Sequence, residues 1–204
     1  MTNITNFYDY STILVCYSAG TGGNHISNLI STSNNVAPRF ISDNYIPDLT
    51  NKYLNADPAK NGVHFGCFIS NVAEFPNLLS TIETSTLPYV IQGHIVEVYH
   101  KIDIFKKQGK IKLVVLEWSP NTIVDRILPK KFNNISEIKF LYNKEAICKL
   151  FEIDKDDVIP ISVDDIFKNN IYDIINTLSY SLGIQLNLEL CDSLHKIWID
   201  RFIK

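Results

Sequence analysis

The chain of 204 residues has few cysteines and no metal-binding pattern. Its 4 cysteines form no C-x-x-C pair and lie far apart, at Cys16, Cys67, Cys148 and Cys191. His64, His100 and His195 likewise have no partners at metal-ligand spacing. These gaps disfavour a zinc knuckle and a disulfide framework, and each cysteine is expected to pack as a small apolar side chain. We therefore predict no bound metal.

Charge and long apolar runs are also scarce. Charged residues make up 20% of the chain and the formal net charge is -3, so no basic excess points to nucleic acid or a membrane surface. No apolar run reaches the roughly 20 residues that a membrane-spanning helix needs, and no charged-then-apolar leader opens the sequence. We expect a cytoplasmic protein with no nucleic-acid or membrane partner. The richness in Asn, Ile and Lys suggests an AT-rich genome, as in a virus.

Apolar material is ample for one folded domain. Hydrophobic residues make up 46% of the sequence. A single domain over residues 1–204 would bury roughly 70% of its unfolded surface. Strand patterns alternate with helical patterns, which predicts an α/β fold of three layers, with a mainly parallel central sheet and helices on both faces. Strands are predicted over residues 11–17, 88–94, 111–116 and 158–163. Helices are predicted over residues 24–33, 72–85, 97–108, 121–128, 135–151, 169–182 and 187–202.

Four local features refine this prediction. Residues 34–72 are rich in Asn, Asp, Pro and Gly, so they are predicted to be mostly irregular and to form a lid or substrate loop. The continuous apolar run over 111–116 favours a central strand. Pro160 indicates a sheet edge or a strand end. Gly183 is predicted to end the helix that precedes it.

The most informative segment is a cluster of glycines between a strand and a helix. The apolar run over 13–17 gives way to Gly20, Gly22 and Gly23, and the sequence then resumes at helical spacing. Residues without side chains let the backbone bring N–H groups against an anion, and the positive end of the following helix points to the same place. We predict an anion-binding loop here. The alternative is a tight strand-to-helix turn that binds nothing.

This loop differs from two common nucleotide-binding loops. A nucleoside-triphosphate P-loop ends in Gly-Lys-Ser/Thr, whereas Gly23 is followed by Asn24 and His25. Hydrolysis of ATP or GTP is therefore disfavoured. The dinucleotide-binding pattern G-x-G-x-x-G can begin at Gly20 and Gly22, but its third position is His25.

Three segments, in this order, resemble the P-loop-like sulfotransferase family, whose members transfer sulfate from 3′-phosphoadenosine 5′-phosphosulfate. The first is the loop Gly20-Thr21-Gly22-Gly23-Asn24-His25. The resemblance implies that this loop, with Ser18 and Ala19 at its start, cradles the 5′-phosphosulfate of the donor. The second is the strand over 88–94, whose last residue, His94, resembles the catalytic histidine of the family. The third, over 111–120, resembles the strand and loop that bind the 3′-phosphate.

Two cations that the family usually carries are missing. Ser18 and Ala19 stand where the family has a lysine before the loop glycine, and Trp118 stands where it has an arginine. Arg126 lies about two helical turns further on and is predicted to supply the missing charge near the 3′-phosphate. Trp118 and Ser119 complete the predicted donor site, with Trp118 either stacking on the adenine ring or roofing the core.

Ligands of open parallel sheets bind beyond the carboxyl ends of the strands, so the predicted site residues are expected to meet at one edge. There His94 is the predicted base that takes the proton of the acceptor, and His25 with the loop amides would neutralise the leaving phosphate. The alternatives are a structural, hydrogen-bonded His94 and a His25 that packs against the start of the helix. Asp164 and Asp165 are expected to cap a helix rather than to bind a metal.

The sequence thus predicts a sulfotransferase that moves sulfate from 3′-phosphoadenosine 5′-phosphosulfate to a hydroxyl of a small molecule or glycan, without a metal. Two alternatives stay open. A non-catalytic descendant of the fold, used for anion binding or protein interaction, would explain the missing lysine and arginine. An atypical P-loop nucleotide kinase would instead bind ATP in a magnesium-dependent way.

Overall fold

A five-stranded sheet in which every strand pair is parallel forms the centre of the protein. The structure is a computed structural model that describes residues 8–17, 22–37, 67–69, 85–117, 144–168 and 170–203. The strands follow the order β2-β3-β1-β4-β5 across the sheet. Their bounds are β1 (Thr12–Tyr17), β2 (Cys67–Phe68), β3 (Tyr89–His94), β4 (Ile111–Glu117) and β5 (Val158–Ser162). This sheet confirms the predicted parallel α/β architecture.

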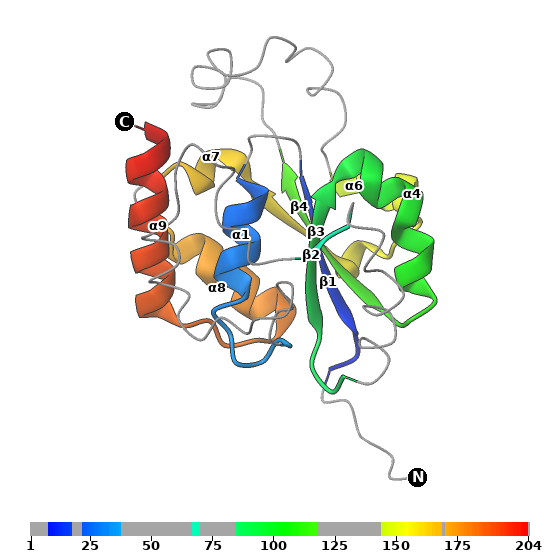
Figure 1. Ribbon diagram of the computed structural model, residues 1–204. Helices are drawn as coiled ribbons and strands as arrows, with labels where there is room; N and C mark the ends of the chain where they lie inside the picture. The colour runs from blue at the N-terminus through cyan, green and yellow to red at the C-terminus, as the bar shows by residue number, and fades with distance from the viewer. Residues whose placement is uncertain are drawn as a thin grey trace.

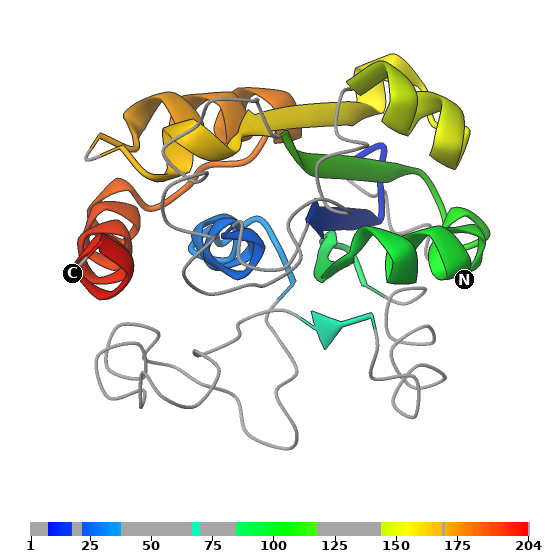
Figure 2. The same ribbon diagram turned by 90° about the horizontal axis from the view of Figure 1, so that it is seen from above.

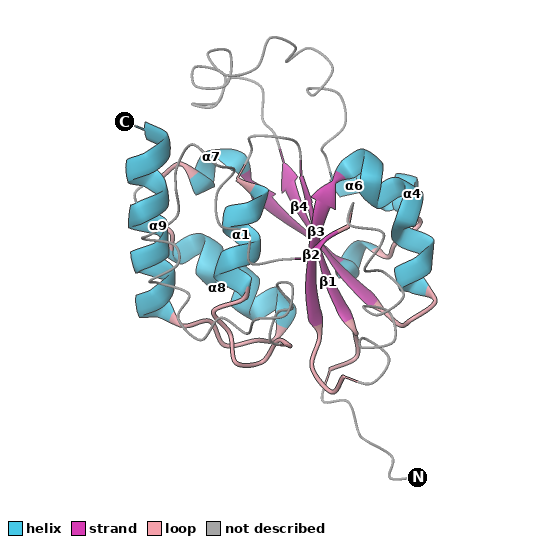
Figure 3. Ribbon diagram, in the orientation of Figure 1, coloured by secondary structure: helices cyan, strands magenta, loops and turns pink. Residues whose placement is uncertain are grey.

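Helices cover both faces of the sheet (Figure 1), and the view from above shows the same two helical layers (Figure 2). Figure 3 shows the strands in magenta between the cyan helices of the two layers. One layer consists of α1 (Gly23–Ile30), α7 (Val163–Ile166), α8 (Tyr172–Leu182) and α9 (Leu188–Ile203). The other consists of α4 (Ile95–Lys106) and α6 (Lys144–Phe151). None of the described helices is long and apolar enough to cross a membrane.

Strand β1 is buried along its whole length because it lies between β3 and β4 and beneath both helical layers. Ile13 and Val15 belong to the core shared with α1, α8 and α9, whereas Leu14 and Cys16 belong to the core shared with α4 and α6. This alternation explains why the strand reads as one continuous apolar run. Burial of each large apolar side chain contributes about 1.5–3 kcal/mol, so β1 is a rigid support for the loop that follows it.

The start of α4 differs from the sequence-based expectation. The helix begins at Ile95, directly after β3, rather than at residue 97. The backbone N–H of His94 donates to a carboxylate oxygen of Glu97 at 3.2 Å. This bond satisfies a backbone donor at the helix start, so the strand passes into the helix without an intervening loop.

Strand β2 lies within the segment predicted to be mostly irregular. Its 2 residues pair with Ile91 and Gln92 of β3. Most of the predicted lid over 34–72 lies outside the described residues. The helix predicted over 72–85 also lies outside them apart from Ser85, as do the whole helix predicted over 121–128 and the first part of the one predicted over 135–151.

Other predicted boundaries are confirmed. Pro160 lies in β5, which is an outermost strand of the sheet, so no neighbour needs the N–H that proline lacks. Gly183 ends α8 in the left-handed conformation, with φ 62°. The apolar run over 111–116 becomes β4, which lies between β1 and β5.

Candidate functional site

The connections that leave neighbouring strands turn to opposite faces of the sheet. Helix α1, which follows β1, packs in the layer with α8 and α9. Helix α4, which follows β3, and α6, the described helix between β4 and β5, pack on the other face. Such a reversal is where open parallel sheets bind their ligands, beyond the carboxyl ends of the strands. The candidate site is therefore the end of β1 with the neighbouring end of β3.

Gly22 sets the direction in which α1 begins. It is the N-cap residue, with φ 90° and ψ 15°, a left-handed conformation that favours glycine. The first bond of the helix runs from the N–H of Ile26 to the carbonyl of Gly22 at 3.1 Å, so the N–H groups of the first turn have no partner within the helix. The first turn of α1 carries no acidic residue that would offset its positive end. This terminus is suited to an anion.

Tyr17, the last residue of β1, connects three parts of the site. Its hydroxyl donates to Oδ1 of Asn24 in α1 at 2.7 Å. Its ring lies so close to Gly23 that a Cβ atom there would stand 2.0 Å from the ring carbons. The same ring meets the ring of His94 edge to face, with centroids 5.2 Å apart and planes at 89°. Packing against Tyr17 thus requires a glycine at position 23.

The Tyr17 hydroxyl is a donor rather than a reacting group. Burial raises the pKa of Tyr17 well above its ordinary value, and the negative charge of Glu97 raises it further. The hydroxyl therefore stays protonated at neutral pH and keeps its bond to Asn24. His94, in contrast, is exposed at the end of β3, and its side chain takes part with Glu97 in the capping box at the start of α4.

His25 belongs to α1, and its side chain packs against α9. Its Nε2 is 3.0 Å from Nδ1 of His195, and its ring stacks on Trp198 with centroids 4.6 Å apart. Nε2 of His195 is 2.7 Å from the carbonyl oxygen of Lys168 and so carries the donated proton. Nδ1 of His195 must then accept from Nε2 of His25. His25 and His94 therefore have different partners, and the structure does not bring their rings into contact.

Both histidines of this pair are neutral. Burial lowers the pKa of His25 well below its usual range, and the nearby His195 lowers it further. Burial also lowers the pKa of His195, although its bond to the Lys168 carbonyl and the charge of Asp192 act in the opposite direction. His25 therefore packs against its neighbours, which is the alternative that the sequence left open for this residue. In the described part of the turn, the donors available to an anion are backbone N–H groups.

Carboxylates at the same edge of the sheet lie at the first turns of helices. Glu117, the last residue of β4, accepts from the backbone N–H of Lys144 at 2.8 Å, at the first residue of α6. Asp164 and Asp165 lie in the first turn of α7, and Asp165 is paired with Lys168. Acidic side chains in a first turn stabilise the positive end of a helix. Among the described residues, no group of three His, Cys, Asp or Glu side chains is placed to hold a metal ion.

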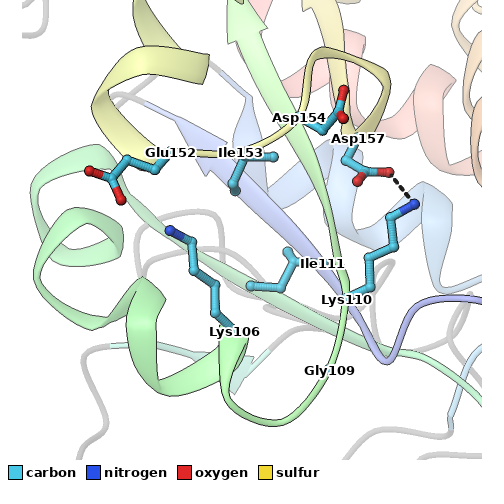
Figure 4. Close-up of a pocket in the computed structure, with 8 residues that line it drawn as sticks. All are labelled: Lys106, Gly109, Lys110, Ile111, Glu152, Ile153, Asp154 and Asp157. Carbon is cyan, nitrogen blue, oxygen red and sulfur yellow. Dashed lines mark ion pairs between the residues drawn. The ribbon is translucent and has the colours of Figure 1, made fainter.

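The opposite edge of the sheet carries a hollow of about 290 Å³ between the starts of β4 and β5 (Figure 4). At this edge Oδ1 of Asp157 lies 3.0 Å from Nζ of Lys110 and 2.7 Å from Nζ of Lys112. Nζ of Lys110 also lies 3.1 Å from Oδ2 of Asp9. Burial would raise the pKa of Asp157, but the bonds from the two lysines outweigh it and lower that pKa. Asp157, Asp9 and the two lysines thus form an ion-pair cluster beside the hollow.

No family model matches the chain, and neither a curated protein nor a solved structure matches it. The geometry of the site is what supports a functional proposal.

The structure brings together part of the predicted site. Gly22, Gly23 and Asn24 form the start of α1, and His94 lies beside them through Tyr17. The other predicted donor residues lie outside the described residues: Ser18, Ala19, Gly20, Thr21, Trp118, Ser119 and Arg126.

Sequence reasoning missed the roles of Tyr17 and Glu97. An aromatic residue just before a glycine loop is a signal for Tyr17. Glutamate three residues after a strand-ending residue is a capping signal that could have located Glu97.

Proposed function

We propose that the protein is a sulfotransferase that binds the phosphosulfate of 3′-phosphoadenosine 5′-phosphosulfate at the N-terminus of α1. The observation that carries this proposal is that the first turn of α1 and the exposed ring of His94 both contact Tyr17, at the strand where the connections change face. Three features support anion binding there: the left-handed Gly22, the free N–H groups of the first turn and the lack of an acidic residue in that turn.

The proposed reaction divides its work between a side chain and the backbone. His94 takes the proton of an acceptor hydroxyl as the acceptor oxygen forms a bond to sulfur. The bond between sulfur and the bridging phosphate oxygen breaks, and adenosine 3′,5′-bisphosphate leaves. The N–H groups of Gly23 and Asn24 would stabilise the charge that develops on the leaving phosphate. The imidazolium of His94 then returns its proton to water.

A second candidate function, anion binding without catalysis, is favoured by the charge of the described edge. Among the described residues, the first turn of α1 carries no lysine or arginine. Lys101 at this edge is bonded to the carbonyl of Ile69, and Lys144 begins α6. The acidic residues Glu97 and Glu117 lie at the same edge. Transfer of a sulfuryl group needs cations or amides around the leaving phosphate. If amides alone are insufficient, the site would hold an anion and not turn it over.

Thermal unfolding with ligands tests the first step of the proposal. Adenosine 3′,5′-bisphosphate at about 100 times its dissociation constant should stabilise the protein by roughly 2.7 kcal/mol. Gly22→Asp should abolish this gain because it places a negative charge at the helix start. Gly22→Asn is the matched control, since it adds similar bulk and strain at the same φ without charge and should keep most of the gain.

The outcomes separate the three functions. Stabilisation by the bisphosphate, followed by sulfate transfer that His94→Ala slows through kcat more than KM, would support the enzyme. Stabilisation with no transfer to any hydroxyl acceptor would support the anion-binding module. Stabilisation by ATP and magnesium alone would favour a kinase, and no shift with any nucleotide would overturn nucleotide binding.

A further inference from the structure

The side chain of Tyr17 connects β1 with α1 and β3. The ring is buried, with 4% of its surface exposed. It contacts the ring of His94, fills the space that Gly23 leaves open and holds Asn24 through its hydroxyl. One side chain therefore touches both the proposed base and the proposed anion-binding turn.

We propose that Tyr17 is a positioning residue that fixes the His94 ring in relation to the first turn of α1. Its importance for catalysis rests on the proposed function, but its effect on the His94 ring does not. His94 is exposed at the strand end, so its ring can turn unless neighbours restrain it, and one restraint is the capping box that its side chain forms with the first turn of α4. The edge-to-face contact with Tyr17 is a second restraint, because aromatic pairs favour that geometry.

The hydroxyl and the ring of Tyr17 have separate tasks. The hydroxyl holds Oδ1 of Asn24, and so fixes the second residue of α1 relative to the end of β1. The ring restrains His94 and occupies the position that a side chain at residue 23 would need. Substitution by phenylalanine removes the first task alone, whereas substitution by leucine removes both.

A purely structural tyrosine would behave differently. Tyr17 also belongs to the core shared with α1, α8 and α9, so its replacement should lower the stability of the whole domain. A loss of stability alone would leave the chemical shifts of the folded protein's His94 ring unchanged. Removing the Tyr17 ring current, however, shifts the His94 signals whether or not Tyr17 orients that ring, so the readout that separates a positioning role from core packing is the side-chain rotamer of His94, measured from ring-proton NOEs and couplings.

The test follows the ring protons of the histidines by NMR in wild type, Tyr17→Phe and Tyr17→Leu. The chain offers an internal control, because the exposed pair Tyr99 and His100 has a similar contact, with centroids 5.5 Å apart. Wild type and Tyr17→Phe should share the ring-current shift and one side-chain rotamer of His94, whereas the His94 ring of folded Tyr17→Leu should populate several rotamers. His100 should stay unchanged in both variants and respond only to Tyr99→Leu.

Binding of adenosine 3′,5′-bisphosphate by calorimetry tests the hydroxyl. Loss of one hydrogen bond that orders the turn should weaken binding about tenfold in Tyr17→Phe, and to the same extent in Asn24→Ala. The double variant should be no weaker than either single one, because both changes remove the same bond. Tyr99→Phe should bind as wild type does.

Two results would overturn the positioning role. One is a His94 ring that keeps a single rotamer in folded Tyr17→Leu; if that variant does not fold, the second result decides alone. The second is a double variant whose loss of nucleotide affinity equals the sum of the losses in Tyr17→Phe and Asn24→Ala. If wild type binds no nucleotide, the same comparison is made with the changes in the backbone amide shift of Gly23. Failure of wild type to bind nucleotide would overturn the proposed function, while the His94 rotamer would still decide the role of Tyr17.

Discussion

Nε2 of His25 donates to Nδ1 of His195 across the interface between α1 and α9, at 3.0 Å and with both rings buried. The two rings and Trp198 form a stack, with planes 9° and 19° from that of the indole. A Cβ atom at Gly22 would lie 3.3 Å from the same indole. The C-terminal helix therefore packs directly on the start of α1, and Trp198 contacts both the histidine pair and the N-cap residue Gly22.

Acid should destabilise the protein through this pair. Burial lowers the pKa of both histidines in the folded state, so below about pH 6.5 the unfolded chain binds more protons than the folded one. The free energy of unfolding should fall as pH drops below this value, by at most about 1.4 kcal/mol per pH unit for each histidine. Urea unfolding at a series of pH values measures this slope.

The matched variant for the pH series replaces both histidines. His25→Phe with His195→Phe keeps two aromatic rings beside Trp198 but has nothing to protonate there. Its unfolding free energy should depend less on pH between about 6.5 and 5 than that of wild type. The same slope in both proteins would show that the pair is not the acid-sensitive element.

Gly23→Ala should disturb the site by collision rather than by backbone strain. The new Cβ would stand 2.0 Å from the ring of Tyr17, so the ring must move, at a cost of about 1–3 kcal/mol. Gly183→Ala is the contrasting variant: its φ is 62°, but nothing lies within 4 Å of the added atom. Of these two glycine variants, only Gly23→Ala should shift the ring signals of His94. Adding Tyr17→Leu to Gly23→Ala should recover part of the stability that Gly23→Ala loses. A larger His94 shift in Gly183→Ala would contradict the packing described here.

Asp157→Asn should lower stability at the amino edge of the sheet. The carboxylate of Asp157 is nearly buried and receives both Lys110 and Lys112, so its removal should cost about 2 kcal/mol at neutral pH. Because the lysines lower the pKa of Asp157, its contribution is present above the unfolded pKa and is lost as pH falls through the folded value. Asp165→Asn, which breaks an exposed pair with Lys168, should change thermal unfolding little. Equal effects of the two variants would argue against the ion-pair cluster.

The sequence predicted much of the fold because its signals are local. The apolar runs of β1 and β4, the edge position of Pro160 and the end of α8 at Gly183 follow from residue type and periodicity. The start of α4 was missed because the Glu97 carboxylate, not the apolar pattern, sets where that helix begins. Strand β2 has only 2 residues and gives no periodic signal.

The site was predicted less completely because its contacts are long-range. The glycines and Asn24 stood out as a cluster between a strand and a helix, and His94 through the family resemblance, but nothing local shows that the ring of Tyr17 is what Gly23 accommodates. The partner of His25 is 170 residues away in the chain. Its packing against α9 therefore depends on how the C-terminal helix folds back, which spacing alone does not reveal.

The most direct measurement is a titration of the protein with adenosine 3′,5′-bisphosphate, followed through backbone amide signals by NMR. The account predicts that the largest shifts fall on the N–H groups of Gly23 and Asn24 and that Gly22→Asp removes them. Shifts confined to Lys106 and Lys110 at the opposite edge, or no shifts at millimolar ligand, would contradict an anion site at the start of α1.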